Sequence, residues 1–85
     1  MENIKTLKKK IIYRSKHRGT KEMDLLLGGF VVKYIDIFSD KELIELNSLL
    51  NTEDEDIYNW YFNRNNSVNF PLNGVTEKFR NFKVF

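Results

Sequence analysis

Apolar residues recur at helical spacing along most of the chain, and this pattern is the main guide to its fold. Ile4, Leu7 and Ile11 fall at positions i, i+3 and i+7, and lysines occupy many of the positions between them, which is typical of a surface helix. We therefore predict a first helix from Ile4 to Ser15. It should end near the segment "KHRG", where Gly19 suits a left-handed helix cap or a tight turn.

A second, longer apolar stripe starts after Thr20 and predicts a helix at the centre of the fold. Its members are spaced alternately by three and one, which fits a period of 3.6 residues far better than a strand. They are Met23, Leu26, Leu27, Phe30, Val31, Tyr34, Ile35 and Phe38. Leu25 and Val32 lie off the stripe, so we expect neighbours on two sides of this helix. Gly28 and Gly29 lie in its middle, and either a close helix crossing or a slight kink explains them.

Two S/T-x-x-E segments predict the starts of the third and fourth helices. In "FSDKEL", Ser39 and Glu42 form a capping box, flanked by the apolar residues of a hydrophobic staple. Thr52 and Glu55 repeat the box ahead of the aromatic segment "IYNWYF", with four acids where a helix N-terminus favours negative charge.

The last part of the chain is predicted to be a loop followed by a short helix. The segment "NRNNSVNFPLNG" has the composition of a loop, with Pro71 and an Asn-Gly pair as turn residues. Val75, Phe79 and Phe82 then fall at i, i+4 and i+7, and no set of alternating strands is recognisable. We expect an all-α fold, a compact bundle of about five short helices in which residues 1–85 form a single helical-bundle domain.

Composition narrows the functional classes. The chain has 85 residues, no cysteine and one histidine, and it contains no phosphate-binding loop motif. We therefore expect no catalytic residue, no metal site and no enzyme activity. The longest apolar run, Leu25 to Val32, is far shorter than the ~20 residues that a membrane span needs, and no secretory signal is recognisable. These features predict a cytoplasmic protein without membrane contact.

Charge is distributed unevenly along the chain, although the net charge is only +2. Residues 1–21 contain eight Lys or Arg and one acid, whereas residues 40–56 contain seven Asp or Glu and one Lys. Most of the early lysines surround the apolar stripe of the first helix, so we expect a solvated face. A surface for nucleic acid or for an acidic protein partner remains open.

The aromatic segment "IYNWYF" is expected to contribute mainly to the core. Ile57, Trp60 and Tyr61 share one helical face, which is the usual pattern of buried residues. Tyr58 and Phe62 lie toward another side, which leaves an exposed aromatic binding patch as the alternative.

The segment "SKHRGTKEMDLLLGGF" reverses its charge at a glycine, and two interpretations of its polar residues are open. In the first, Arg18 pairs with Glu22 across the turn, and Glu22 and Asp24 satisfy a helix N-terminus. His17 then lies at the C-terminal end of the preceding helix, where a dipole favours it. In the second, Gly19 lets another backbone approach closely, and Arg18 and Glu22 offer donors and an acceptor to a partner.

Two segments resemble a known family. "HRGTKEMDLLL" resembles the R-G-x-x-E signature of the small assembly factors that promote covalent flavin attachment to the flavoprotein subunit of succinate dehydrogenase and, in bacteria, of fumarate reductase. "LLNTEDEDIYNWYF" resembles that family's L-L-x-x-x-D-x-D-[LI]-[YF]-N-W block, at the expected distance downstream. The resemblance covers about residues 11–63. It implies a helical bundle that binds the flavoprotein subunit, with FAD as the cofactor of that client and none bound tightly by this chain.

The resemblance also implies a site. It places Arg18, Gly19 and Glu22 at the interface with the flavoprotein, together with Asp24 and with His17, which stands where many bacterial members have another arginine. We expect Arg18 to be a charge-assisted anchor and Glu22 an acceptor for a cationic group of the partner, while Gly19 keeps the approach open. The free chain is expected to be a monomer that binds no nucleic acid. The alternative function is a basic nucleic-acid-binding or general protein-interaction module.

Overall fold

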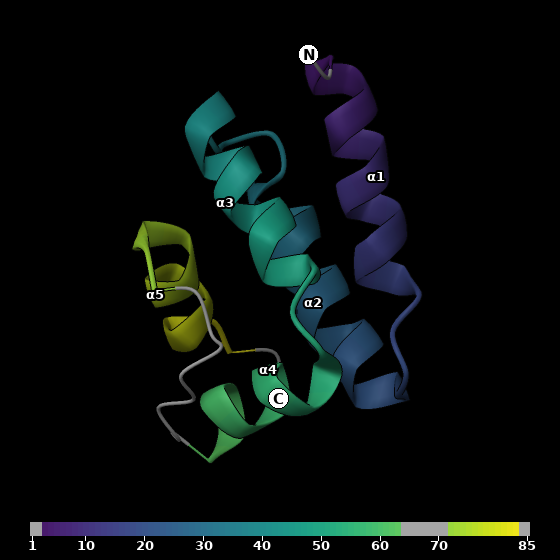
Figure 1. The fold of residues 1–85 in the computed structure, drawn as a ribbon, viewed down its shortest axis with the longest axis vertical. Coiled ribbons are helices and arrows are strands. Elements are labelled where there is room, and N and C mark those ends of the chain that lie inside the picture. The colour runs from purple at the N-terminus through teal and green to yellow at the C-terminus, as the bar shows by residue number, and fades with distance from the viewer. Residues whose placement is uncertain (1–2, 64–71, 84–85) are drawn as a thin grey trace.

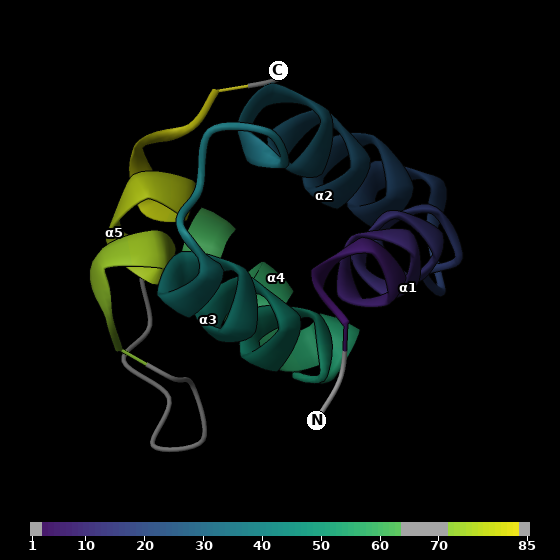
Figure 2. The ribbon, with the colours of Figure 1, turned by 90° about the horizontal axis from the view of Figure 1, so that it is seen from above.

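A computed structural model gives the fold and describes residues 3–63 and 72–83. Within these ranges the chain forms five helices and no strand, which confirms the all-α prediction. The helices are α1 (Ile4–Lys16), α2 (Lys21–Tyr34), α3 (Asp40–Leu50), α4 (Asp54–Phe62) and α5 (Gly74–Asn81). In the view of Figure 2, α1, α2, α5 and α3 surround a common interior, and α4 crosses one end, at the bottom of Figure 1.

The main helix contacts are those of α1 with α2, of α1 with α3 and of α3 with α5. The second helix is therefore one wall of the bundle, and the prediction that it lies at the centre is wrong (Figure 2). The predicted neighbours on two sides are present, because α2 contacts α1 and its Phe30 ring packs on Phe79 of α5. Leu25 and Val32, the residues that suggested them, are nevertheless 52% and 68% exposed. An apolar residue off the main stripe does not by itself require a covering layer, since single exposed apolar side chains are common on protein surfaces.

The predicted apolar stripe of α2 is buried except for Tyr34, which is half-buried, and the helix ends at Tyr34, before the stripe does. The backbone N–H groups of Ile37 and Phe38 both donate to the carbonyl oxygen of Tyr34, at 2.9 and 3.0 Å, in a turn that follows the helix. Ile35 and Phe38 remain buried in this turn. The early end follows from the next signal in the chain, because Ser39 starts α3 and the chain must reverse its direction before that residue.

The capping box of α3 is confirmed. The Ser39 hydroxyl accepts from the backbone N–H of Glu42 at 3.2 Å, and the Glu42 carboxylate accepts from the backbone N–H of Ser39 at 3.0 Å. Phe38 and Leu43, the two residues of the predicted staple, are both buried. Local sequence chemistry therefore determines where this helix begins.

The predicted capping box of α4 is wrong. The N-cap residue is Glu53, whose side chain makes no capping hydrogen bond, while the Thr52 hydroxyl donates back to the carbonyl oxygen of Ser48 at 3.3 Å. Only two residues separate the last turn of α3 from this N-cap, so Thr52 serves the end of the preceding helix instead.

The last helix starts with a capping box formed by Asn73 and Thr76, whereas the sequence pattern predicts Asn73 only as a turn residue. The Asn73 side chain accepts from the backbone N–H of Thr76 at 2.9 Å, and the Thr76 hydroxyl accepts from the backbone N–H of Asn73 at 2.9 Å. Val75 and Phe79 are buried as predicted, and Phe82 follows the helix as its C-cap residue. The other predicted turn residue, Pro71, lies outside the described residues.

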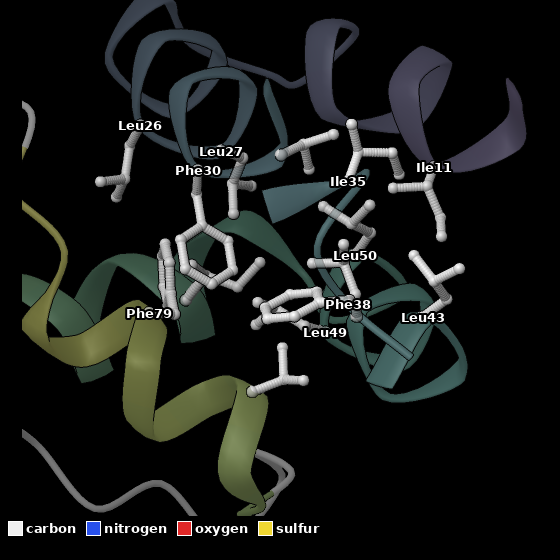
Figure 3. Packing of buried hydrophobic residues seen from close by; sticks show 14 of the residues in the cluster. Ile11, Leu26, Leu27, Phe30, Ile35, Phe38, Leu43, Leu49, Leu50 and Phe79 are labelled. Atoms are coloured by element: carbon white, nitrogen blue, oxygen red, sulfur yellow. The ribbon is translucent and has the colours of Figure 1, made fainter. Parts of the chain in front are cut away.

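The core is organised around Phe30 of α2, which is fully buried (Figure 3). Its ring meets the rings of Phe38, Phe79 and Phe82 edge-on, with centroids 6.1, 5.2 and 5.4 Å away. Such edge-to-face pairs add to the free energy gained by burying the rings. Phe30 thus joins α2, the turn after it and the last helix in one cluster.

Gly28 lies on the side of α2 that faces α1, but its contacts do not by themselves require a glycine. This residue is buried, and a Cβ atom built on it would lie 3.8 Å from the carbonyl oxygen of Ser15 in α1, an ordinary van der Waals distance. The helix continues through both glycines. Gly28 therefore faces α1 but leaves room for a methyl group.

Candidate docking site

All five residues predicted for the partner site lie at one junction of the fold. His17, Arg18 and Gly19 belong to the connection between α1 and α2, and Glu22 and Asp24 lie in the first turn of α2. This connection is at the end of the bundle where α4 crosses (Figure 1). The junction therefore brings the two segments that resemble the flavinylation factors next to each other.

The Arg18 side chain points into the protein and is only 10% exposed. Its Nε donates to Asp54 Oδ1 at 2.7 Å, and its Nη2 lies 2.7 Å from the same oxygen. Nη1 donates to the carbonyl oxygen of Leu50 at 2.7 Å, and Nη2 also donates to that of Thr52 at 2.9 Å. We call the ion pair the Arg18–Asp54 bridge. It joins the start of α4 and the end of α3 to the α1–α2 connection.

Gly19 lies against the same carboxylate. Its backbone N–H donates to Asp54 Oδ2 at 2.6 Å, and a Cβ atom built on it would lie 3.0 Å from that oxygen. The residue does not have a positive φ, so the prediction of a left-handed helix cap is wrong. The close approach of Asp54, rather than an unusual backbone conformation, favours a glycine here.

The acids of α2 have separate roles. Asp24 Oδ1 accepts from the backbone N–H of Arg18 at 2.7 Å, which ties the connection to the first turn of α2. Thr20 is the N-cap, and its hydroxyl accepts from the backbone N–H of Met23 at 3.2 Å. The local pair of Arg18 with Glu22 is not formed, because the carboxylate that meets Arg18 is Asp54. Glu22 is exposed, and so available to another molecule.

A pocket of about 470 Å³ lies beside the bridge. It is lined by Thr20, Glu22, Met23, Asp54, Glu55 and Tyr58. Glu22 and Glu55 are exposed acids from the starts of α2 and α4, and Tyr58 is a 45% exposed aromatic residue of α4. Carboxylates next to apolar and aromatic surface suit a cationic side chain with an apolar stem.

His17 lies at the C-terminal end of α1, as one of the two interpretations predicted. Its Nδ1 is 2.8 Å from the carbonyl oxygen of Tyr13, and the two rings stack with centroids 3.9 Å apart. Both residues are exposed. The contacts of His17 are thus with its own helix, and a contact with a partner stays a prediction.

The aromatic segment of α4 divides as predicted. Ile57 and Trp60 are buried, and Tyr61 packs against the core. Tyr58 and Phe62 are 45% and 37% exposed, with ring centroids 4.7 Å apart. The exposed pair extends from the pocket along α4.

The basic face of α1 has partners within the chain. Lys8 lies 3.5 Å from Asp36 of the turn after α2, and Arg14 donates to the side-chain oxygen atoms of Asn47 and Asn51 in α3 and at its end. Lys9 is exposed. Among residues 3–63 and 72–83, no group of three or more His, Cys, Asp or Glu residues is placed to hold a metal ion.

Asp54 has no predicted role in the site, although its carboxylate contacts both Arg18 and Gly19. The residue lies 36 positions from Arg18, so no local pattern links the two. A signal was nevertheless present, because Asp54 is the first aspartate of the L-L-x-x-x-D-x-D block, and Arg18 and Gly19 begin the R-G-x-x-E signature.

A helical bundle with an exposed acidic and aromatic pocket beside a partly buried ion pair has the character of a protein-binding module. Comparison with known proteins specifies the class. A family model described as "Flavinator of succinate dehydrogenase" matches residues 9–83, so the chain belongs to this family. The family is one of assembly factors, and this membership confirms the prediction that the chain is not an enzyme.

Individual relatives support the assignment. The "Succinate dehydrogenase assembly factor 2, mitochondrial" of Saccharomyces cerevisiae is 41% identical over 75 residues, which are 88% of this chain and 43% of that protein. The protein of the same name from Candida glabrata is 36% identical over 83 residues, which are 98% of this chain and 51% of that protein. That of Dictyostelium discoideum is 43% identical over 60 residues, which are 71% of this chain and 43% of that protein.

The chain spans about half the length of the curated relatives that it matches. No solved structure matches it. None of the helices in the described part of the chain is long and apolar enough to cross a membrane.

Proposed function

We propose that this protein binds the flavoprotein subunit of succinate dehydrogenase, or the related subunit of fumarate reductase, and promotes covalent attachment of FAD to it. The match of residues 9–83 to the flavinator family carries this proposal. The names of the relatives, as assembly factors of succinate dehydrogenase, agree with it. FAD belongs to the client in this proposal, and this chain binds no cofactor tightly.

The surface proposed for docking is the pocket beside the Arg18–Asp54 bridge. Glu22 is exposed on its edge, and Glu55 lies at the start of the facing helix. The acids suit a lysine or arginine of the flavoprotein, whose apolar stem is accommodated by Met23 and Tyr58. Gly19 is exposed next to this pocket, and the absence of a side chain there keeps the surface open.

The proposed contribution to the chemistry is one of positioning. By binding the flavoprotein, the factor stabilises the conformation in which the client's own histidine is aligned with the 8α-methyl group of the flavin. Alignment of reacting groups can supply several kcal/mol of the barrier reduction, without any catalytic side chain from this chain.

Co-expression of the flavoprotein subunit with variants of this chain tests the proposal. Glu22→Ala removes the exposed acceptor and Gly19→Arg fills the open surface, so both are expected to reduce covalent flavin, measured as in-gel fluorescence after denaturation. Glu77→Ala is the matched control, since Glu77 is also an exposed glutamate in the first turn of a helix. Undiminished covalent flavin with soluble, folded Glu22 and Gly19 variants would contradict the role given to this surface.

The competing function is binding of nucleic acid or of an acidic protein through the basic face of α1. Removal of the positive charges of Lys9 and Lys10 separates the two functions. A nucleic-acid site gives binding that weakens steeply with salt and depends on these lysines. The proposed function predicts instead that covalent flavin is unaffected by Lys9→Ala and Lys10→Ala, and that a pull-down recovers mainly the flavoprotein.

The location and the oligomeric state remain proposals. The sequence predicts the cytoplasm, whereas the relatives are named as mitochondrial proteins, and the proposed function requires this chain to be where its flavoprotein client is. Cell fractionation followed by detection of both proteins tests this point.

We propose that the free chain is a monomer, which sedimentation measurements at several concentrations would show.

A further inference from the structure

We infer that Arg18 and Asp54 act together as positioning residues for the docking surface, and that Arg18 contributes through Asp54 rather than by contacting the partner. This inference rests on the proposed function for its effect on the flavoprotein. It goes beyond that function by assigning a role to Asp54 and by replacing the anchor role that the family resemblance suggests for Arg18.

The guanidinium nitrogen atoms of Arg18 are already engaged within the chain. Each of its three guanidinium nitrogen atoms has an acceptor within the chain, between 2.7 and 2.9 Å away. A direct contact with a partner requires the side chain to leave these acceptors. The carbonyl oxygen atoms of Leu50 and Thr52 and the Asp54 carboxylate then lose a charged donor, which is costly in a site so little exposed.

The Arg18–Asp54 bridge connects the start of α2 with α4, the two elements that line the pocket. Thr20, Glu22 and Met23 come from the start of α2, whereas Asp54, Glu55 and Tyr58 come from α4. Asp54 Oδ1 meets the Arg18 guanidinium and Asp54 Oδ2 meets the Gly19 N–H, so one carboxylate holds both residues that precede α2. The relative position of the two exposed acids, Glu22 and Glu55, therefore depends on this carboxylate.

The contacts of Arg18 need a guanidinium and not only a positive charge. A guanidinium presents its donors in a planar fork, which here serves a carboxylate and two carbonyl oxygen atoms at once. A lysine carries the same charge but has one nitrogen atom, which cannot reach all of these acceptors. Arg18→Lys therefore distinguishes a bridge that needs geometry from an anchor that needs charge.

The test measures the affinity of the purified flavoprotein subunit for the wild-type chain and for Arg18→Ala, Asp54→Ala and the double variant, at a temperature where all are folded. The bridge predicts that each single variant weakens binding by about tenfold and that the double variant is no weaker than either single one, because coupled residues are not additive. It also predicts that Arg18→Lys behaves like Arg18→Ala.

A direct anchor predicts a different result. Asp54→Ala then releases Arg18 without removing it, so the affinity stays at the wild-type level or rises, while Arg18→Ala alone weakens binding. This pattern overturns the inference, and so does a wild-type affinity of Arg18→Lys for the flavoprotein subunit.

A structural control separates positioning from loss of stability. Phe79→Leu weakens the core in α5, where Phe79 packs on Phe30 and Tyr61 rather than on the bridge. Phe79→Leu and Asp54→Ala are compared under conditions in which their free energies of unfolding are equal. The inference requires Phe79→Leu to keep the wild-type affinity for the flavoprotein while Asp54→Ala loses it. Equal loss of affinity in both variants assigns the effect to stability and overturns the positioning role.

A measurement on the chain alone distinguishes failure of the inference from failure of the proposed function. Amide exchange of Gly19 is expected to be slow in the wild type, because its N–H donates to Asp54, and to become faster to the same extent in Arg18→Ala and Asp54→Ala. Slow exchange with no binding of the flavoprotein contradicts only the proposed function. Fast exchange of Gly19 in the wild type overturns the bridge itself.

Discussion

At the scale of single residues, two glycines of this chain differ in what surrounds them. A Cβ atom on Gly19 would lie 3.0 Å from Asp54 Oδ2, which is too close without a shift of that carboxylate. A Cβ atom on Gly28 would meet the nearest atom at 3.8 Å. The contacts of Gly19 therefore disfavour a side chain unless the Asp54 carboxylate shifts, whereas those of Gly28 leave room for a methyl group.

This difference gives a paired prediction. Gly28→Ala should raise the free energy of unfolding by up to about 1 kcal/mol, because alanine is the better helix former and its methyl group fits. Gly19→Ala should lower it, because the shifted Asp54 carboxylate weakens its bonds to Arg18 and to the Gly19 N–H. Urea unfolding of the two variants side by side provides the measurement. A stabilised Gly19→Ala variant would show that the carboxylate gives way freely.

Residue chemistry also shows why the site was only partly predictable. Glu22, Gly19 and Arg18 were identified because they are close in sequence and form a motif. The partner of Arg18 was not, since Asp54 is a distant residue among four successive acids, any of which satisfies a helix N-terminus equally well in sequence terms. Only the three-dimensional structure distinguishes which of these acids faces the arginine.

At the scale of elements, an S/T-x-x-E motif predicts the start of a helix correctly where the end of another helix does not lie directly before it. Ser39 is the N-cap of α3 and forms the expected capping box. Thr52 lies between the end of α3 and the start of α4 and is not the N-cap of α4, which is Glu53. The sequence motif is the same, but the short connection after α3 leaves Thr52 bonded backward to Ser48. Competition between neighbouring elements, which a local motif does not contain, accounts for the error.

The two capping motifs therefore predict unequal effects of the same change. Ser39→Ala should lower the free energy of unfolding by about 1 kcal/mol, because it removes the acceptor of an N-cap. Thr52→Ala should have less than half of that effect, since only an exposed hydrogen bond to a carbonyl oxygen is lost. Thermal unfolding followed by circular dichroism measures both. Equal losses would indicate that Thr52 caps α4 in solution.

At the scale of the whole molecule, stability depends on a core that α2 and α5 share through Phe30. The sequence predicted these buried stripes because helical periodicity reports directly on burial. It did not predict the placement of α2 in the bundle, since the periodicity of one helix says nothing of how many neighbours cover its other sides.

Replacement of residues on opposite sides of α2 tests this arrangement. Phe30→Ala should lower the free energy of unfolding by about 3–5 kcal/mol, because a fully buried ring is lost from the core. Val32→Ala, at a 68% exposed position of the same helix, should change it by less than about 0.5 kcal/mol. Urea unfolding gives both values, and a large effect at Val32 would mean that another surface covers this side of α2.

The Arg18–Asp54 bridge also has a consequence for the order in which the molecule forms. It joins residues 36 positions apart, and closure of so long a loop is entropically unfavourable until other contacts hold its ends together. We therefore expect the bridge to form only once other contacts hold these segments together. A partly folded chain would then lack the proposed docking surface, and a client that binds this surface would select only those copies of the factor that have finished folding.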